Sequence, residues 1–275
     1  FILSGFILSY NHSDTRASDW KLFYLNRFAR LWPAHIAAAA LWLYFGYPGF
    51  VGVEKNVAIF ATITNLTLTQ SFIPFSAFYS SINPVAWSIS VEVFFYLVFP
   101  LIVAGGIVSA SRWLAASFAL LVAIITAVVL FDVPNATEDP MGVSVSSIIY
   151  SFPLARLFEF CLGCFTAFLF KKYNGHRFNK QTLLEIAALG LVILSMALTA
   201  SQEFRMLLPP YYPVGAWTIW SGSCIPMAVL IYVMAVGGGK VSKALSNRVI
   251  VYLGEISFSL YLVHLTMLCI FMVYA

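Results

Sequence analysis

The sequence consists of long apolar runs separated by short polar stretches, and the runs show no alternation of apolar and polar positions. With a window of about 19 residues, eight runs stand out, at residues 31–45, 57–72, 86–108, 113–131, 148–170, 183–200, 217–236 and 250–274. Residues 1–10 are also apolar but cover only about half of the roughly 20 residues that a membrane helix needs. Because backbone polar groups in lipid must be paired within a segment, the runs predict helices rather than barrel strands. We therefore predict an all-α, polytopic transmembrane helix bundle of about eight to nine apolar helices.

The composition agrees with this prediction and excludes an ordinary water-soluble enzyme. Charged residues make up 9% of the 275 residues, against roughly a quarter in soluble domains, so membrane lipid is the expected solvent. The net charge of +4 is small and the basic residues stand in short clusters, so no nucleic-acid partner is expected. Since the sequence contains no linker, low-complexity tract or repeat, residues 1–275 are interpreted as one membrane domain.

The charges between the runs predict the orientation of the chain. Three basic clusters are expected to be cytoplasmic by the positive-inside rule, and they contain Arg16, Lys21, Arg27 and Arg30, then Lys171, Lys172, Arg177 and Lys180, then Lys240, Lys243 and Arg248. Five apolar runs separate the first cluster from the second, and five full crossings would place the two on opposite faces. Either one run does not cross, or the charge rule fails for one of the two loops. The candidate for a run that does not cross is 57–72, which ends in a polar stretch suited to a re-entrant segment.

Ionisable side chains inside apolar runs are the best candidates for function, because a charge at mid-bilayer costs roughly 2.5 to 3.5 kcal/mol on the insertion scale. Glu92 shares one predicted helix face with Ser88 and Tyr96. Such a polar stripe faces either a cavity or another helix. Glu92 is thus a candidate for holding a base or a substrate hydroxyl, and the alternative is a buried acid neutralised by a cation on a neighbouring helix.

Three further ionisable residues lie in later runs. Arg156 and Glu159 are three positions apart, close enough to pair on their own helix, which favours a structural role. His264 shares a helix face with Tyr261. Histidine is the commonest proton-transfer residue near neutral pH, but a lone intramembrane histidine is more often a hydrogen-bonded helix contact.

Two other patterns allow a structural and a functional interpretation. Arg27 and Arg30 stand one helical turn apart before an apolar run, so they suit either a membrane anchor or phosphate recognition. Cys161 and Cys164 form an isolated C-x-x-C pair inside an apolar run. Packing is favoured over a metal or redox role, and no metal site is expected.

Five stretches, taken in order, resemble acyltransferase family 3, the integral membrane O-acyltransferases of bacterial polysaccharides and related glycans. They are FILSGFIL from Phe1, RFARLWP from Arg27, AWSISVEVFFY from Ala86, LARLFEFCLG from Leu154 and ISFSLYLVH from Ile256. The resemblance implies transfer of an acyl group, usually acetyl, from cytoplasmic acyl-coenzyme A to a sugar hydroxyl. It further implies a multi-pass protein of the bacterial inner membrane, with acyl-CoA as donor substrate and no permanently bound cofactor.

The resemblance also assigns the candidate residues. Glu92 and His264 become candidate catalytic residues, and the candidate substrate-binding residues are Arg27, Arg30, Trp87, Ser88, Tyr96, Arg156, Glu159 and Tyr261. The first helix of the family carries an Arg and a His regarded as its catalytic motif, and we expect that helix to precede Phe1. A transporter for a sugar or lipid-linked glycan, and a non-catalytic membrane scaffold, are the alternatives.

Overall fold

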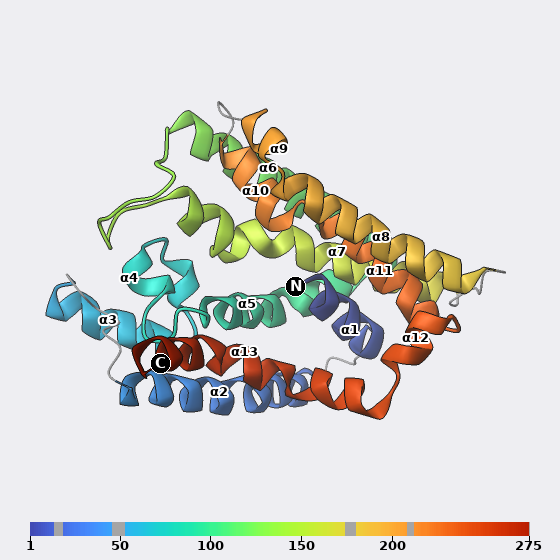
Figure 1. Ribbon diagram of the computed structural model, residues 1–275, viewed down its shortest axis with the longest axis horizontal. Coiled ribbons are helices and arrows are strands. Elements are labelled where there is room, and N and C mark those ends of the chain that lie inside the picture. Colours follow the sequence, from blue (N-terminus) through green and yellow to red (C-terminus); the bar gives the residue numbers. More distant parts are fainter. Residues whose placement is uncertain (14–18, 46–52, 174–179, 208–211, 275) are drawn as a thin grey trace.

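Helices joined by turns and irregular segments make up the part of the protein that the computed structural model describes, residues 1–13, 19–45, 53–173, 180–207 and 212–274 (Figure 1). No strand occurs in these ranges, so the all-α prediction is confirmed. The helices are α1 (Ile2–His12), α2 (Trp20–Tyr44), α3 (Lys55–Leu66), α4 (Ser76–Tyr79), α5 (Trp87–Val103), α6 (Gly106–Leu130), α7 (Pro153–Lys172), α8 (Gln181–Ala200), α9 (Gln202–Met206), α10 (Tyr212–Ser221), α11 (Cys224–Val236), α12 (Lys240–Leu245) and α13 (Arg248–Tyr274). A 3₁₀ turn (Gln70–Phe72) precedes α4, and a π-helical turn (Ser146–Tyr150) precedes α7.

Five helical stretches of the described chain are long and apolar enough to cross a membrane, which fits a multi-pass membrane protein. They are Gly106–Leu130, Ser146–Lys172, Gln181–Ala200, Pro213–Val236 and Arg248–Met272. In most of them the large apolar side chains face outward, as they do in helices surrounded by lipid. The predicted number of eight to nine apolar helices is not confirmed.

Helix α7 lies at the centre of the bundle and packs most closely against α1. Two glycines allow this approach: a Cβ atom on Gly5 would stand 2.2 Å from the carbonyl oxygen of Phe160, and one on Gly163 would stand 2.0 Å from that of Ile2. Small residues serve the same purpose in other membrane helix pairs. On its other side α7 packs against α5, where the rings of Phe95 and Phe160 stack with their centroids 4.5 Å apart.

The chain between α3 and α5 is largely non-helical and buried, and side-chain amides connect it to α3 and α13. His35 of α2 lies with Nε2 3.0 Å from the Asn65 carbonyl oxygen. Asn65 Nδ2 donates to the Ser81 carbonyl at 2.8 Å, and Asn83 Nδ2 donates to the Leu262 carbonyl of α13 at 2.9 Å. Irregular backbone at membrane depth is tolerated where the protein itself supplies such partners. Helix α3 has 12 residues and α5 has 17. The prediction that residues 57–72 form a re-entrant segment is not confirmed.

The end of α7, the start of α8 and α12 lie together on the right in Figure 1, and these segments carry described residues of the second and third basic clusters. Lys171 Nζ at the end of α7 donates to Ser13 Oγ, just after α1, at 2.6 Å. Near the start of α8, Glu185 accepts hydrogen bonds of 3.0 Å from the backbone N–H groups of Gly239, which precedes α12, and Val241, in its first turn. The ends of α1 and α7 therefore meet, and that this end faces the cytoplasm stays a prediction. Arg16 and Arg177 lie outside the described residues.

Candidate active site

Glu92 lies near the start of α5, on the face that meets α1 and α2. Its Oε1 accepts two hydrogen bonds, one of 2.9 Å from Ser4 Oγ of α1 and one of 2.6 Å from the hydroxyl of Tyr96. Tyr96 follows Glu92 by one helical turn, as the spacing predicts. Two donors on one carboxylate oxygen fix the orientation of the group, and Oε2 has no hydrogen-bond partner among the described residues.

Arg27 and Arg30 of α2 stand on the opposite wall of a cavity of about 160 Å³. We call it the arginine cavity; its lining residues are Leu3, Ser4, Ile7, Leu8, Arg27, Arg30, Glu92 and Tyr96. The Arg27 guanidinium carbon lies 6.0 Å from the centre of the Tyr96 ring, and its buried Nε has no hydrogen-bond partner in the described chain. The only ion pair of 4.0 Å or less among the described residues joins Arg156 and Glu159. The arginine cavity therefore holds two cations and one carboxylate that are not paired with one another.

An apolar cavity of about 240 Å³ adjoins the arginine cavity, because Arg27 and Tyr96 line both. Its other lining residues are Tyr24, Phe28, Leu31, Trp32, Leu68, Val93 and Leu97. Leu68 adopts a left-handed backbone conformation, with φ 57°, although it is not glycine. Such strained residues are concentrated at functional sites.

The remaining candidates on α5 and α13 lie beside this site rather than in it. Ser88, one turn before Glu92, shares a hydrogen bond of 2.8 Å with the hydroxyl of Tyr261 and thereby joins α5 to α13. Trp87 is buried against the ring of Tyr150, with a centroid separation of 4.4 Å. Neither Trp87 nor Tyr261 lines the arginine cavity.

His264 is exposed, and its Nδ1 lies 2.5 Å from the Tyr261 carbonyl oxygen of its own helix. It lines neither the arginine cavity nor the adjoining apolar one. The structure thus brings Glu92 together with Arg27 and Arg30 but does not bring His264 to them.

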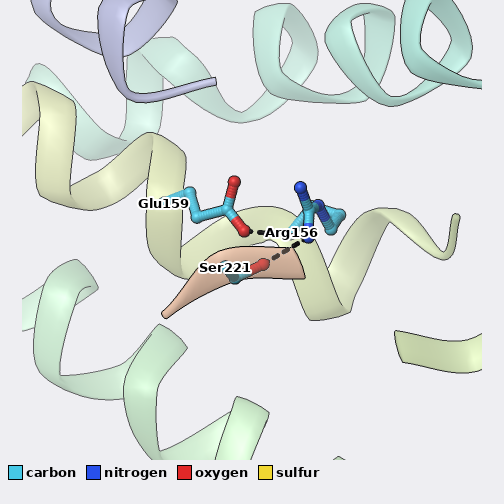
Figure 2. A network of polar contacts seen from close by, with 3 residues as sticks. All are labelled: Arg156, Glu159 and Ser221. Carbon is cyan, nitrogen blue, oxygen red and sulfur yellow. Dashed lines mark hydrogen bonds and ion pairs between the residues drawn. The ribbon is translucent and has the colours of Figure 1, made fainter. Parts of the chain in front are cut away.

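Arg156 and Glu159 form the ion pair that their spacing predicts, and they do so in the core of the protein. Arg156 Nη1 lies 3.0 Å from Glu159 Oε1 and donates to Ser221 Oγ of α10 at 2.5 Å (Figure 2). The two residues are 7% and 6% exposed. The Arg156 guanidinium also lies over the rings of Phe1 and Tyr150, 5.2 and 5.9 Å from their centres.

Sequence reasoning missed Ser4 and Ser221, the hydroxyl partners of Glu92 and Arg156. Both are single serines in apolar surroundings, and serine is common in membrane helices as a contact between helices. Only their pairing with an ionisable residue on another helix distinguishes them, and that pairing requires the fold.

Comparison with known proteins identifies the class to which this fold and site belong. The family described as "Acyltransferase domain" matches residues 1–275. The chain therefore belongs to this acyltransferase family, and the resemblance found in the sequence is confirmed.

Two relatives were found. "Acyltransferase MdmB" of Streptomyces mycarofaciens is 28% identical over 276 residues, which cover 96% of this chain and 65% of that protein. An "Uncharacterized protein" of Haemophilus influenzae (strain ATCC 51907 / DSM 11121 / KW20 / Rd) is 34% identical over 115 residues, or 37% of this chain and 46% of that protein. The chain thus spans less than two thirds of the length of either relative. No solved structure matches it.

Proposed function

We propose that the protein is a membrane O-acyltransferase of the bacterial inner membrane, which moves an acyl group, acetyl in the simplest case, from cytoplasmic acyl-CoA to a hydroxyl of a polysaccharide or other glycan. One observation carries the proposal: Glu92, Tyr96, Arg27 and Arg30 line a single cavity within a bundle of the acyltransferase family. The cavity is formed by α1, α2 and α5, and α1 and α2 adjoin the basic end of the bundle.

The reaction needs three groups from the protein. The hydroxyl oxygen attacks the thioester carbonyl carbon, a carbon–oxygen bond forms, the carbon–sulfur bond breaks, and the hydroxyl proton ends on the coenzyme A thiol. A group must receive that proton, a donor must stabilise the oxygen on which negative charge develops, and cations must hold the phosphates of the coenzyme.

The two arginines suit the donor side of this reaction. Arg30 is exposed, so it is positioned to bind a phosphate that arrives from the basic end. Arg27 has a buried Nε without a partner in the described chain. In the proposal it donates a hydrogen bond to the thioester oxygen, and the adjoining apolar cavity takes the acyl group or the neighbouring pantetheine chain.

Glu92 suits the acceptor side. Its Oε1 is held by Ser4 and Tyr96, whereas Oε2 has no partner among the described residues. In the proposal Oε2 accepts the hydrogen of the attacking hydroxyl, and the two donors on Oε1 keep the carboxylate in place.

The same proposal includes a topology. We propose that α3 and α5, each shorter than a membrane span at 12 and 17 residues, together form one crossing with the irregular segment 67–86 between them. This leaves an even number of crossings between the first two basic clusters. Discontinuous helices of this kind form the binding sites of many membrane transporters.

The experiment is an assay of the whole protein in sealed membrane vesicles with acetyl-CoA that carries a labelled acetyl group. The label is expected in the glycan fraction as an alkali-labile ester, and only when acetyl-CoA has access to the cytoplasmic face. Movement of a glycan across the membrane without transfer of label would instead support the transporter alternative.

A further inference from the structure

A second and larger cavity lies on the other side of α1. Its volume is about 330 Å³, at the lower end of the range of roughly 300 to 1,000 Å³ for ligand pockets. We call it the α10–α11 cavity; its lining residues are Ile2, Glu159, Met196, Thr199, Ala200, Ile219, Trp220, Ser221, Ser223, Cys224 and Met227. The reaction proposed above uses none of the helices that form most of this cavity.

The ion pair at the wall of this cavity has unused hydrogen-bonding capacity. Nε of Arg156 and Oε1 of Glu159 are buried without a hydrogen-bond partner in the described chain, since the 3.0 Å contact is an ion pair that lacks hydrogen-bond geometry. The second carboxylate oxygen of Glu159 points away from Arg156 (Figure 2). Buried charges are costly unless hydrogen bonds complete them. This second oxygen, Oε2, has no hydrogen-bond partner among the described residues and, unlike Oε1, is not buried. An open carboxylate oxygen in the lining of a cavity indicates a ligand that donates hydrogen bonds.

The rest of the lining indicates which ligand this is. Trp220 lies beside Tyr150, with ring centroids 5.1 Å apart, so an aromatic surface stands next to the carboxylate. Ser221, Ser223 and Thr199 add hydroxyl groups. A sugar ring matches this combination, because its C–H faces pack on aromatic rings and its hydroxyls bond to carboxylates and hydroxyls. The single carboxylate, already paired with Arg156, favours a neutral sugar over a charged one.

The α10–α11 cavity lies away from the basic end. Thr199 follows Glu185, which contacts the segment before α12, by 14 positions on α8, or about 21 Å along the helix. The first turn of α1 separates it from the arginine cavity, since Ile2 lines one cavity and Ser4 lines the other. A donor from the basic end and an acceptor from the opposite end would therefore be bound on the two sides of this turn, and the acceptor hydroxyl must extend past it to reach the thioester.

We infer that the α10–α11 cavity binds the neutral sugar ring that carries the acceptor hydroxyl, with Glu159 accepting hydrogen bonds from the sugar and Trp220 packing on its face. The inference rests on the proposed function, because it names where the acceptor of that reaction is held. In this inference Arg156 and Ser221 orient the Glu159 carboxylate.

The first test is steady-state kinetics of the whole protein with labelled acetyl-CoA and a panel of methyl glycosides. Trp220→Leu is expected to raise the KM for the glycoside about tenfold, the effect of losing one aromatic contact, and to leave the KM for acetyl-CoA unchanged. Trp113→Leu removes a half-buried tryptophan of α6 that lines none of the three cavities, and it is expected to change neither constant. An unchanged glycoside KM in Trp220→Leu, or an equal rise of both constants, would overturn the assignment.

The second test needs no catalysis. Thr199→Cys, in a background in which Cys161, Cys164, Cys224 and Cys269 are replaced by serine or alanine, is expected to react with a membrane-impermeant maleimide added at the end opposite the basic clusters. Methyl glycosides are expected to slow this reaction. Protection without any transfer would refute the proposed acyltransferase while keeping a sugar site. Transfer by the parent protein without protection would refute the sugar site alone, and the absence of both would refute both. Thermal unfolding of each variant shows whether it is folded.

Discussion

Ser4 of α1 donates a hydrogen bond of 2.9 Å to Glu92 of α5, although the two residues are 88 positions apart in the chain. This contact ties α1 to Glu92, the only acidic residue among the described residues that line the arginine cavity. Ser4 belongs to the first turn of α1, and Ile2 of the same turn borders the α10–α11 cavity. Helix α1 is thus shared by both cavities.

Removal of either donor to Glu92 is expected to impair transfer. A hydrogen bond to a charged group contributes about 1.5 to 3 kcal/mol, so Ser4→Ala and Tyr96→Phe should each lower kcat by about tenfold or more. Ser109→Ala removes an exposed hydroxyl that bonds only to the Leu101 carbonyl, and it serves as the control. Normal turnover in both cavity variants would show that the orientation of Glu92 does not matter.

Arg30→Ala is expected to weaken the binding of acyl-CoA, because an exposed guanidinium that meets a phosphate contributes mainly to substrate capture. The KM for acetyl-CoA should rise about tenfold or more, Arg30→Lys should restore part of the loss, and the effect should shrink at high salt. Arg112 is exposed on α6 outside this cavity, so Arg112→Ala should leave the KM unchanged. Equal effects of Arg30→Ala and Arg112→Ala would remove Arg30 from the site.

The contact between α1 and α7 should be intolerant of any side chain at Gly163. A Cβ atom there would lie 2.0 Å from the carbonyl oxygen of Ile2, whereas one on Gly190 of α8 would have no atom within 4 Å. Gly163→Ala is therefore expected to destabilise the protein by about 1 to 3 kcal/mol or more, and Gly190→Ala to have little effect or to stabilise α8 slightly. Thermal unfolding in detergent measures both, and similar melting temperatures would contradict the close packing.

Replacing one partner of the buried Arg156–Glu159 ion pair should destabilise the protein more than replacing both partners. Arg156→Leu leaves Glu159 charged and buried, and the expected loss of stability is about 3 to 5 kcal/mol. The double variant Arg156→Leu, Glu159→Leu should be more stable than Arg156→Leu alone, because no unpaired charge remains. Chemical denaturation of the single and double variants tests this order. A double variant that is less stable than the single one would indicate that the pair itself stabilises the fold.

The contact between Lys171 and Ser13 also predicts that these two positions lie on the same side of the membrane. Reporter fusions after Ser13 and after Lys172 should both report the cytoplasm, because the two positions lie at one end of the bundle. A fusion after Ala200 should report the other side. Opposite readouts after Ser13 and Lys172 would contradict the described arrangement.

Much of the architecture follows from the sequence because apolar runs in lipid have few alternatives to helices. The run predicted at 183–200 is α8 (Gln181–Ala200), and the run at 113–131 covers most of α6 (Gly106–Leu130) and ends one residue beyond it. The structure of residues 57–72 could not be predicted from the local pattern. Helix α3 ends at Leu66, and the Asn65 side chain donates a hydrogen bond to the Ser81 carbonyl. These are tertiary contacts that a periodic pattern does not encode.

The candidate site was predictable in its charged members and not in its neutral ones. Glu92, Arg27 and Arg30 stand out because ionisable groups are rare in apolar sequence, and the fold brings them to one cavity. His264 stands out for the same reason, yet it is exposed and bonded to its own helix. Whether Glu92 or His264 faces the two arginines depends on how each helix is rotated in the bundle. The presence of an ionisable residue in an apolar run does not determine that rotation. Trp220 and Ser221 acquire significance only through the cavity that they line.

The most direct test of the central claim compares two glutamates in the acyl-transfer assay. Glu92→Gln keeps the shape of the side chain but removes the carboxylate that would receive the hydroxyl proton, and the exposed Glu255 of α13 provides the matched control, Glu255→Gln. Both variants are reconstituted at equal amounts of folded protein with labelled acetyl-CoA and glycan acceptor. We expect Glu92→Gln to lose about 10²-fold or more of its transfer rate and Glu255→Gln to match the parent. A folded Glu92→Gln variant with the full parental rate would contradict the assignment of this cavity as the site of acyl transfer.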